Sequence, residues 1–317
     1  MKLRLAVIGA GTFGRNHVRV LSRLPGVELV AIVDSDFAKA QELAAEHGSQ
    51  AFSSIKTMPL LDAAIVATPT VTHEEIAAHL LHSGIDVLVE KPIATTAAAG
   101  ERLARLADEK GRILQVGHLE RFNPAVIALE KALTIPLFFE VHRLSVFTPR
   151  SLDIDVVLDL MIHDLDLVLS FTQAFPEEIR AAGISVLSNK VDIANVRLSF
   201  ASGCIANLTA SRVSVEQVRK LRLFQPGEYI SLDYQRQDAT RFSVTSAAHI
   251  GFEQLPVGRI EPLEAELAAF CDSVRQRTRP RVDAWQGSRA LQLAEAILDK
   301  IKEHSAIVAE TIRSRAT

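Results

Sequence analysis

The sequence predicts an α/β protein, in which a doubly wound parallel sheet is followed by an α+β domain with a large, mostly antiparallel open sheet. Short apolar runs alternate with helical patterns through the first 120 residues, as expected for parallel strands covered by helices. From residue 138 the pattern changes to two-residue alternation with hairpin turns, which favours antiparallel strands. The chain of 317 residues is long enough for two cores. We therefore expect two domains, 1–120 and 121–317.

The first motif lies between two expected strands, Leu3–Ile8 and Leu29–Val33. The glycine-rich run Gly9-Ala10-Gly11-Thr12-Phe13-Gly14 separates the first strand from a helical pattern. Such glycines allow a tight turn and let the backbone approach a pyrophosphate at the start of the helix. A glycine turn that serves packing alone is the structural alternative, but the strand, turn, helix and strand context favours dinucleotide binding.

Asp34 ends the second strand, where a carboxylate can bind both ribose hydroxyls of NAD and repel a 2′-phosphate. The run Asp34-Ser35-Asp36 contains no arginine or lysine that would pair with such a phosphate. The sequence therefore favours NAD over NADP.

Further strands are expected at Ala63–Ala67, Val87–Val89 and Ile113–Val116, with helices between them, the first opened by a capping box of Thr72 and Glu75. Ligands of a parallel sheet bind beyond the carboxyl ends of its strands. Polar residues follow those ends, and we predict that they contact the cofactor: Thr68, Thr70, His73, Glu90 and Lys91. His118 and Arg121, near the domain junction, are predicted to contact nicotinamide or substrate. Each could instead be an ordinary polar loop residue.

The segment Asp155–Phe171 reads as an apolar helix that carries polar residues of catalytic type. Asp159 and His163 are four residues apart, which places them on one helical face and lets the carboxylate orient the imidazole. Asp164 and Asp166 point to other faces, which argues against a metal site, although aspartate and histidine do bind zinc or manganese. A structural alternative leaves the three aspartates facing water. From the helix alone, all three interpretations stay open.

The remaining segments complete the second domain. Asn123 and Pro124 begin a helix that runs to Ala132, hairpins turn near residues 202 and 226, and two amphipathic helices cover Leu263–Gln276 and Ser288–Glu303. Asn123 is a candidate substrate contact. Arg212 suits a diphosphate, but an ordinary charge at a strand end explains it equally well. Four arginines between residues 275 and 281 are interpreted as a solvated face.

Composition restricts the partners. Lys and Arg total 35 against 38 Asp and Glu, a net charge of −3, so nothing draws the protein generally to nucleic acid or to anionic membranes. The two cysteines form no Cys-x-x-Cys pair, and no apolar run approaches the roughly 20 residues of a membrane span. We expect a soluble, cytoplasmic protein that binds small molecules and no metal.

Three motifs together, GAGTFG, Glu90-Lys91-Pro92 and Asp159-x-x-x-His163-Asp164, resemble the glucose-fructose oxidoreductase, inositol dehydrogenase and rhizopine-catabolism protein family. The resemblance implies an NAD-binding Rossmann domain and a second domain that supplies substrate contacts and the interface of a homodimer or homotetramer. It also implies that Lys91 is the active-site lysine and that Asp159 and His163 are the catalytic pair, facing Lys91.

Within this family, the runs GHLERFNPA and DVVLDLMIHDLD resemble a subgroup that oxidises the 3-hydroxyl of UDP-N-acetylglucosamine with NAD, a step towards lipid A. The chain departs from the wider family where Asp153-Ile154-Asp155 replaces a glycine-rich run, which argues against transferring the substrates of the free-sugar and inositol members. A dehydrogenase of a free sugar or inositol remains the alternative. An NAD-binding regulatory protein is another, although it would have no need of Lys91, Asp159 and His163.

Overall fold

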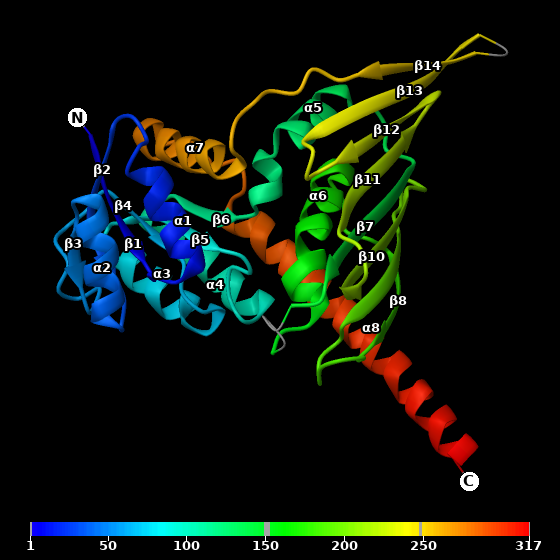
Figure 1. Ribbon diagram of the computed structural model, residues 1–317, viewed down its shortest axis with the longest axis horizontal. Helices are drawn as coiled ribbons and strands as arrows, with labels where there is room; N and C mark the ends of the chain where they lie inside the picture. Colours follow the sequence, from blue (N-terminus) through cyan, green and yellow to red (C-terminus); the bar gives the residue numbers. More distant parts are fainter. Residues whose placement is uncertain (1, 149–152, 247–248, 317) are drawn as a thin grey trace. The chain divides into compact units, whose positions relative to one another are not determined.

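The computed structural model describes residues 2–148, 153–246 and 249–316 (Figure 1). The chain forms two compact units, one of Met1–Phe122 with Ile260–Arg289 and the other of Asn123–Arg259 with Ala290–Thr317. The sequence-based division placed everything after residue 120 in the second domain. In the structure, Ile260–Arg289 packs instead with the first unit.

The first unit is built on a six-stranded sheet in the order β3-β2-β1-β4-β5-β6, and all of its strand pairs are parallel. The strands are β1 Leu3–Ile8, β2 Val27–Val33, β3 Gln50–Phe52, β4 Ala63–Val66, β5 Asp86–Glu90 and β6 Leu114–Gly117. The strand order reverses between β1 and β4, and a crevice at such a switch point is the usual ligand site of a doubly wound sheet. The predicted fold class of this half is confirmed.

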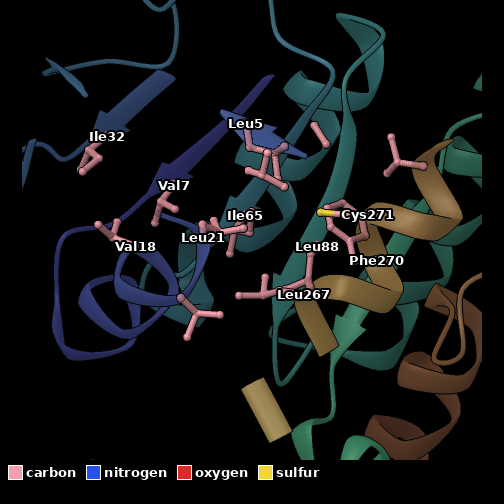
Figure 2. Close-up of a cluster of buried hydrophobic side chains, with 14 of the residues drawn as sticks. Leu5, Val7, Val18, Leu21, Ile32, Ile65, Leu88, Leu267, Phe270 and Cys271 are labelled. Carbon is pink, nitrogen blue, oxygen red and sulfur yellow. The ribbon is translucent and has the colours of Figure 1, made fainter. Parts of the chain in front are cut away.

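The helices of the first unit are α1 Thr12–Leu21, α2 Phe37–His47, α3 His73–His82, α4 Ala97–Lys110 and α7 Pro262–Gln276, with 3₁₀ turns η1 Thr70–Thr72 and η2 Leu119–Phe122. Leu267 and Phe270 of α7 join Leu88 of β5 in a buried cluster (Figure 2). Helix α2 was not predicted from the sequence. It buries only Ala40, Leu43 and Ala44, so its apolar pattern is weak.

Two predicted helix ends behave differently in the structure. The hydroxyl of Thr96 accepts the Ala99 N–H at 3.2 Å and caps α4, which ends at Gly111 in the left-handed conformation. The expected capping box at α3 does not form. The Thr72 hydroxyl donates to the Pro69 carbonyl at 2.8 Å, within the 3₁₀ turn. This local hydrogen bond engages the hydroxyl group that a capping box would use to bind a backbone N–H of the helix.

The arginine run at the end of α7 and just after it is largely exposed, as the interpretation as a solvated face expected, but several of its side chains also bind the first unit. Arg275 donates to the carbonyl of Gly26 at 2.9 Å, and Arg277 binds Asp86 and the carbonyl of Gly111. Arg281 donates to the backbone carbonyl of Arg121 at 2.9 Å. These side chains fasten a late segment of the chain to turns formed more than a hundred residues earlier.

The second unit contains an eight-stranded sheet in the order β14-β13-β12-β11-β7-β10-β9-β8. Only the β7–β10 pair is parallel among its pairs, which confirms the mostly antiparallel sheet within the described residues. The strands are β7 Phe138–Val146, β8 Glu178–Ile184, β9 Ile193–Ser199, β10 Ile205–Ser214, β11 Val218–Gln225, β12 Glu228–Asp233, β13 Asp238–Ser246 and β14 His249–Gln254.

Helices lie against one face of this sheet. They are α5 Pro124–Ala132, the π-helical turn η3 Val157–Met161, α6 Ile162–Thr172 and the final helix α8 Ala284–Ala316, which is longer than the expected Ser288–Glu303. Phe139 of β7 stacks on Phe171 of α6 with ring centroids 6.2 Å apart. Among the described residues, no helix combines the length and apolar character needed to cross a membrane.

Candidate active site

Each of the three glycines in the first turn has a different structural environment. Gly9 has φ +103°, and a Cβ there would collide with the carbonyl of Ala67. A Cβ at Gly14 would collide with the carbonyl of Gly9, whereas one at Gly11 would meet no atom within 4 Å. Gly11 therefore faces open space at the start of α1, where backbone N–H groups and the helix dipole suit a pyrophosphate.

The carboxylate of Asp34 is fixed beside this turn. It accepts the N–H of Ala10 at 2.7 Å through Oδ2 and the N–H of Asp36 at 2.8 Å through Oδ1. Each carboxylate oxygen has a second lone pair, so the group can bind ribose hydroxyls while the backbone holds it in place. The exposed positions Thr12 and Phe13 follow directly. This donor and acceptor set, with the space at Gly11, fits a dinucleotide.

The loop after β4 is tied to the turn after β5 by His73. Its Nδ1 lies 2.9 Å from the Pro92 carbonyl and its Nε2 lies 2.9 Å from the Thr68 carbonyl. The ring is 1% exposed, and burial lowers its pKa despite the two carbonyl contacts. Because both ring nitrogens face backbone oxygens, His73 holds the two loops together; its contact with the cofactor stays a prediction. Thr68 and Thr70 lie half-buried in this loop.

Glu90 and Lys91 end β5. Glu90 Oε1 lies 2.7 Å from Nε2 of His17, a buried residue of α1. Burial alone would raise the pKa of Glu90, but the hydrogen bond and electrostatic interaction with His17 and the positive charge of Lys91 lower it. The carboxylate is thus ionised beside Lys91, which is half-buried. His17 was not found from the sequence, although it lies on α1 three residues after Gly14.

His118 and Arg121 follow β6, as expected, and both are buried, with exposures of 1% and 6%. Arg121 lies in η2, whose backbone is held by Arg281; the guanidinium of Arg281 also lies over the ring of Phe122 at 5.9 Å. The structure therefore places both residues in a fixed turn at the carboxyl edge of the first sheet.

The predicted catalytic helix forms, but with a π-helical turn at its start. Asp159 lies in η3 and His163 in the first turn of α6, both half-buried. The N–H of Ile162 donates to the carbonyl of Val157, five residues earlier. Such a turn alters the rotation between Asp159 and His163 from that of a regular α-helix, and π turns occur frequently at functional sites.

Helix α6 is anchored by a buried ion pair. Asp164 accepts two hydrogen bonds from Arg143 of β7, at 2.7 and 2.8 Å, and one from the Tyr234 hydroxyl at 3.2 Å. The guanidinium lies over the Tyr234 ring at 4.9 Å. Asp164 is 1% exposed and Asp166 is 3% exposed, so the alternative in which they face water is wrong. Asp164 fixes the helix from which His163 projects.

Two residues that the sequence predicts as substrate contacts have structural partners in the described part of the chain. Asn123 caps α5 by accepting the Ala125 N–H at 3.1 Å, and its amide donates to the Tyr234 carbonyl at 3.1 Å. Arg212 is buried, donates to the Ile154 carbonyl and lies 3.7 Å from Asp192. Both residues support the start of a helix.

Asp192 organises the loop that adjoins the start of η3. Its Oδ2 accepts the N–H groups of Val186, Leu187 and Ser188 at 2.7, 2.7 and 2.9 Å. Burial alone would raise the pKa of Asp192, but these bonds and that of the Ser188 hydroxyl lower it to about 2. Within the described ranges, no group of three or more His, Cys, Asp or Glu side chains has the arrangement of a metal site.

Comparison with known proteins identifies the class. Residues 3–118 match the family model described as an oxidoreductase family with an NAD-binding Rossmann fold, and residues 140–224 match the GFO/IDH/MocA C-terminal domain. The chain belongs to the GFO/IDH/MocA oxidoreductase family. It is therefore an NAD-dependent oxidoreductase acting on CH–OH groups, and its cofactor is NAD, which the glycine turn and Asp34 fit.

Among curated proteins, the UDP-N-acetylglucosamine 3-dehydrogenase of Acidithiobacillus ferrooxidans is 33% identical over 299 residues, covering 92% of this chain and 95% of that protein. A solved structure of that enzyme has a TM-score of 0.91, with 32% identity and coverage of 96% and 99%. The scyllo-inositol 2-dehydrogenase (NAD⁺) of Bacillus subtilis is 26% identical over 307 residues, or 89% of each chain. Levoglucosan dehydrogenase in complex with NADH and levoglucosan, at 18% identity and TM-score 0.87, shares the fold and covers 96% and 98%.

Proposed function

We propose that the protein oxidises the 3-hydroxyl of UDP-N-acetylglucosamine to the 3-keto sugar with NAD. The observation that carries this proposal is the similarity to the Acidithiobacillus ferrooxidans enzyme of that activity, which extends over 92% of this chain. The coverage includes both units, so it spans the segments that supply the cofactor turn and the Asp159–His163 helix.

The proposed chemistry divides between a hydride and a proton. NAD, held by the glycine turn and Asp34, would supply the hydride acceptor for C3. His163 takes the hydroxyl proton as general base, a contribution of about 10²–10⁴-fold in typical enzymes. Asp159 orients the imidazole and stabilises the imidazolium. Lys91 donates to the reacting oxygen and stabilises the developing alkoxide. In this scheme the first unit binds the cofactor, and the second unit supplies His163 and the sugar contacts.

A second copy of the chain is proposed as a partner, forming a homodimer or homotetramer. On the sheet face opposite the helices, aromatic side chains follow one another across β7, β11, β12 and β13. Phe138, Phe224, Tyr229 and Phe242 have successive centroid distances of 5.8, 5.2 and 4.5 Å. Phe252 of β14 is paired with Phe242 and is 77% exposed. A row of partly exposed aromatic side chains that ends in the exposed Phe252 is typical of an interaction surface. Sedimentation at several concentrations tests this, and a monomer throughout would refute it.

A cytoplasmic location belongs to the same proposal. Cys204 and Cys271 are free and buried, and burial raises the pKa of both thiols to about 11. Free, unreactive thiols are typical of proteins in a reducing compartment such as the cytoplasm. The 3-keto product would there be available to an aminotransferase, which would yield the 3-amino sugar used in lipid A.

Oxidation of inositol is the second candidate, favoured by similarity to several inositol 2-dehydrogenases at 26–33% identity. The test follows formation of reduced nicotinamide by its absorbance. Protein and NAD are mixed in parallel with UDP-N-acetylglucosamine, N-acetylglucosamine, glucose and myo-inositol, with a carbonyl trap to pull an unfavourable equilibrium. We expect turnover with the nucleotide sugar alone. Turnover with inositol but not the nucleotide sugar would select the second candidate. NAD binding without turnover on any of the four would refute the dehydrogenase proposal.

A further inference from the structure

A second carboxyl group is buried near Glu90 in the first unit. Glu266 of α7 is 1% exposed, and its Oε1 has no hydrogen-bond partner among the described residues. Its neighbour Leu267 and, one turn later, Phe270 pack on Leu88 of β5 (Figure 2). Leu88 and Glu90 lie two residues apart on β5 and therefore face the same side of the sheet. Glu266 thus enters the apolar layer on the side to which Glu90 points.

The two carboxyl groups have different surroundings. Glu90 has His17 at 2.7 Å and the charge of Lys91 nearby. No ion pair to Glu266 occurs in the described part of the chain, and burial together with the negative charge of Glu90 raises its pKa well above the usual range. Two carboxyl groups that share a dry site cannot both ionise easily. Glu90 is therefore the charged member and Glu266 the protonated one.

The elements packed around this pair carry other titratable groups. His17 of α1 and Lys91 after β5 act directly on Glu90, while η2, which packs against α7, carries Glu120 and Arg121, and α7 itself carries the Cys271 thiol. Gln115 of β6 is paired with Leu88 and adds a buried neutral amide on the same side. The charge of Arg19 on α1 is held outside this layer by Glu261. The acid pair is thus the buried anionic centre of this region.

The order of the strands brings this centre towards the nicotinamide half of the cofactor. Asp34 ends β2 and the glycine turn follows β1, whereas Glu90 ends β5 on the other side of β1. A dinucleotide whose adenosine ribose binds Asp34 and whose pyrophosphate lies at Gly11 extends towards β4 and β5. The nicotinamide ring carries a positive charge in NAD⁺ and none in NADH. An added positive charge favours the ionised form of a nearby acid.

We propose that Glu90 and Glu266 form a buried acid pair that keeps one proton in the cofactor-free and NADH-bound protein and releases it to solvent when NAD⁺ binds. The pair then couples protonation to the charge of the nicotinamide. By linkage, the affinity for NAD⁺ rises with pH, by up to about tenfold per pH unit where the pair titrates, while the affinity for NADH does not. This inference concerns cofactor binding only and does not depend on the proposed substrate.

Calorimetry tests the proposal without any sugar. Binding of NAD⁺ and of NADH to the full chain is measured near pH 7 in two buffers of different ionisation enthalpy, which gives the protons released per cofactor bound. We expect release of a substantial fraction of a proton with NAD⁺ and much less with NADH. Equal release with both cofactors in the unaltered protein would overturn the proposal, whether or not any variant folds.

Variants assign the proton. Glu266→Gln keeps the size of the side chain but cannot ionise, so NAD⁺ binding should become independent of pH and release should vanish. Glu264→Gln, an exposed position on the same helix, is the matched control and should behave as the unaltered protein does. Release that persists in Glu266→Gln but disappears in Lys91→Met would place the proton on the lysine and overturn the assignment.

Discussion

The two units use their polar residues differently. In the first, the residues singled out from the sequence follow strand ends, and several remain available to a ligand; Gly11 faces open space and Asp34 has lone pairs left after binding two N–H groups. In the second, Asn123, Arg212 and Asp164 are buried in contacts with backbone or side chains. The difference teaches that a polar residue of a suitable type can serve the fold alone, as these three do.

The comparison predicts that Asp159 and His163 are the chemically active exception in the second unit. His163→Ala should lower kcat by about 10²–10⁴-fold, the usual contribution of a general base. Affinity for NAD should stay near normal, since the residue lies outside the cofactor turn. His142→Ala, at a partly exposed histidine on β7, is the control. Steady-state rates measure both variants, and unchanged turnover in His163→Ala would remove it from the mechanism.

The neighbouring Asp164 should affect stability first. Arg143→Met leaves the Asp164 carboxylate buried without its main partner, which costs about 3–5 kcal/mol in comparable pairs. Arg222→Met breaks an exposed pair with Glu140 and should cost about 0–1 kcal/mol. Urea unfolding gives both free energies, and replacing both partners by Arg143→Met with Asp164→Leu should recover part of the loss. Equal small costs for the two arginines would refute the anchoring role.

Lys91 tests the first unit. Lys91→Met should lower kcat by about 10²–10³-fold, the cost of losing one donor to a developing oxyanion, while NADH binding measured by fluorescence stays near normal. Lys110→Met, at the exposed end of α4, should change neither quantity. A variant at Lys91 that loses NADH binding in proportion to turnover would make the lysine a cofactor contact and not a catalytic residue.

The depressed pKa of Asp192 should make the free energy of unfolding fall at low pH. Its folded pKa of about 2 lies below the ordinary value of an aspartate, 3.8, so the stabilisation is present above the unfolded pKa and is lost as pH falls towards the folded pKa. From the shift we expect about 2 kcal/mol. Unfolding free energies of the natural protein and of Asp192→Asn should differ at neutral pH and converge as pH approaches 2. A constant difference over that window would contradict the depressed pKa.

The smallest effect concerns the choice of cofactor. Asp34→Ala should weaken NAD binding about tenfold, the low end for a hydrogen bond to a charged group, and should relax discrimination against NADP because the repulsive carboxylate is gone. Titrations with NAD and NADP measure the ratio. A variant that keeps both affinities would show that Asp34 acts only on the glycine turn through Ala10.

What the sequence could predict follows from the range of each interaction. Alternation along the chain and the glycine spacing are local, and they predicted the parallel sheet, the antiparallel sheet and the cofactor turn. The pairing of Arg143 with Asp164 and the contacts of Arg275 and Arg281 join residues that only the fold brings together. The π turn at Asp159 is local, but the apolar periodicity of its segment is equally compatible with a regular α-helix. Arg143 lies two and four residues after the inward-facing Val141 and Phe139, so the two-residue period of the strand places it on the same buried face; this is the signal in the sequence of its burial.

The most direct measurement of the proposed reaction follows the hydride itself. UDP-N-acetylglucosamine deuterated at C3 is incubated with the protein, NAD and a carbonyl trap, and the mass of the reduced nicotinamide cofactor is compared with that from the unlabelled sugar. The account predicts transfer of the deuterium to the cofactor, together with a slower rate if hydride transfer limits turnover. Reduced cofactor without deuterium would place the oxidation at another carbon, and no reduced cofactor from either sugar would contradict the proposed activity.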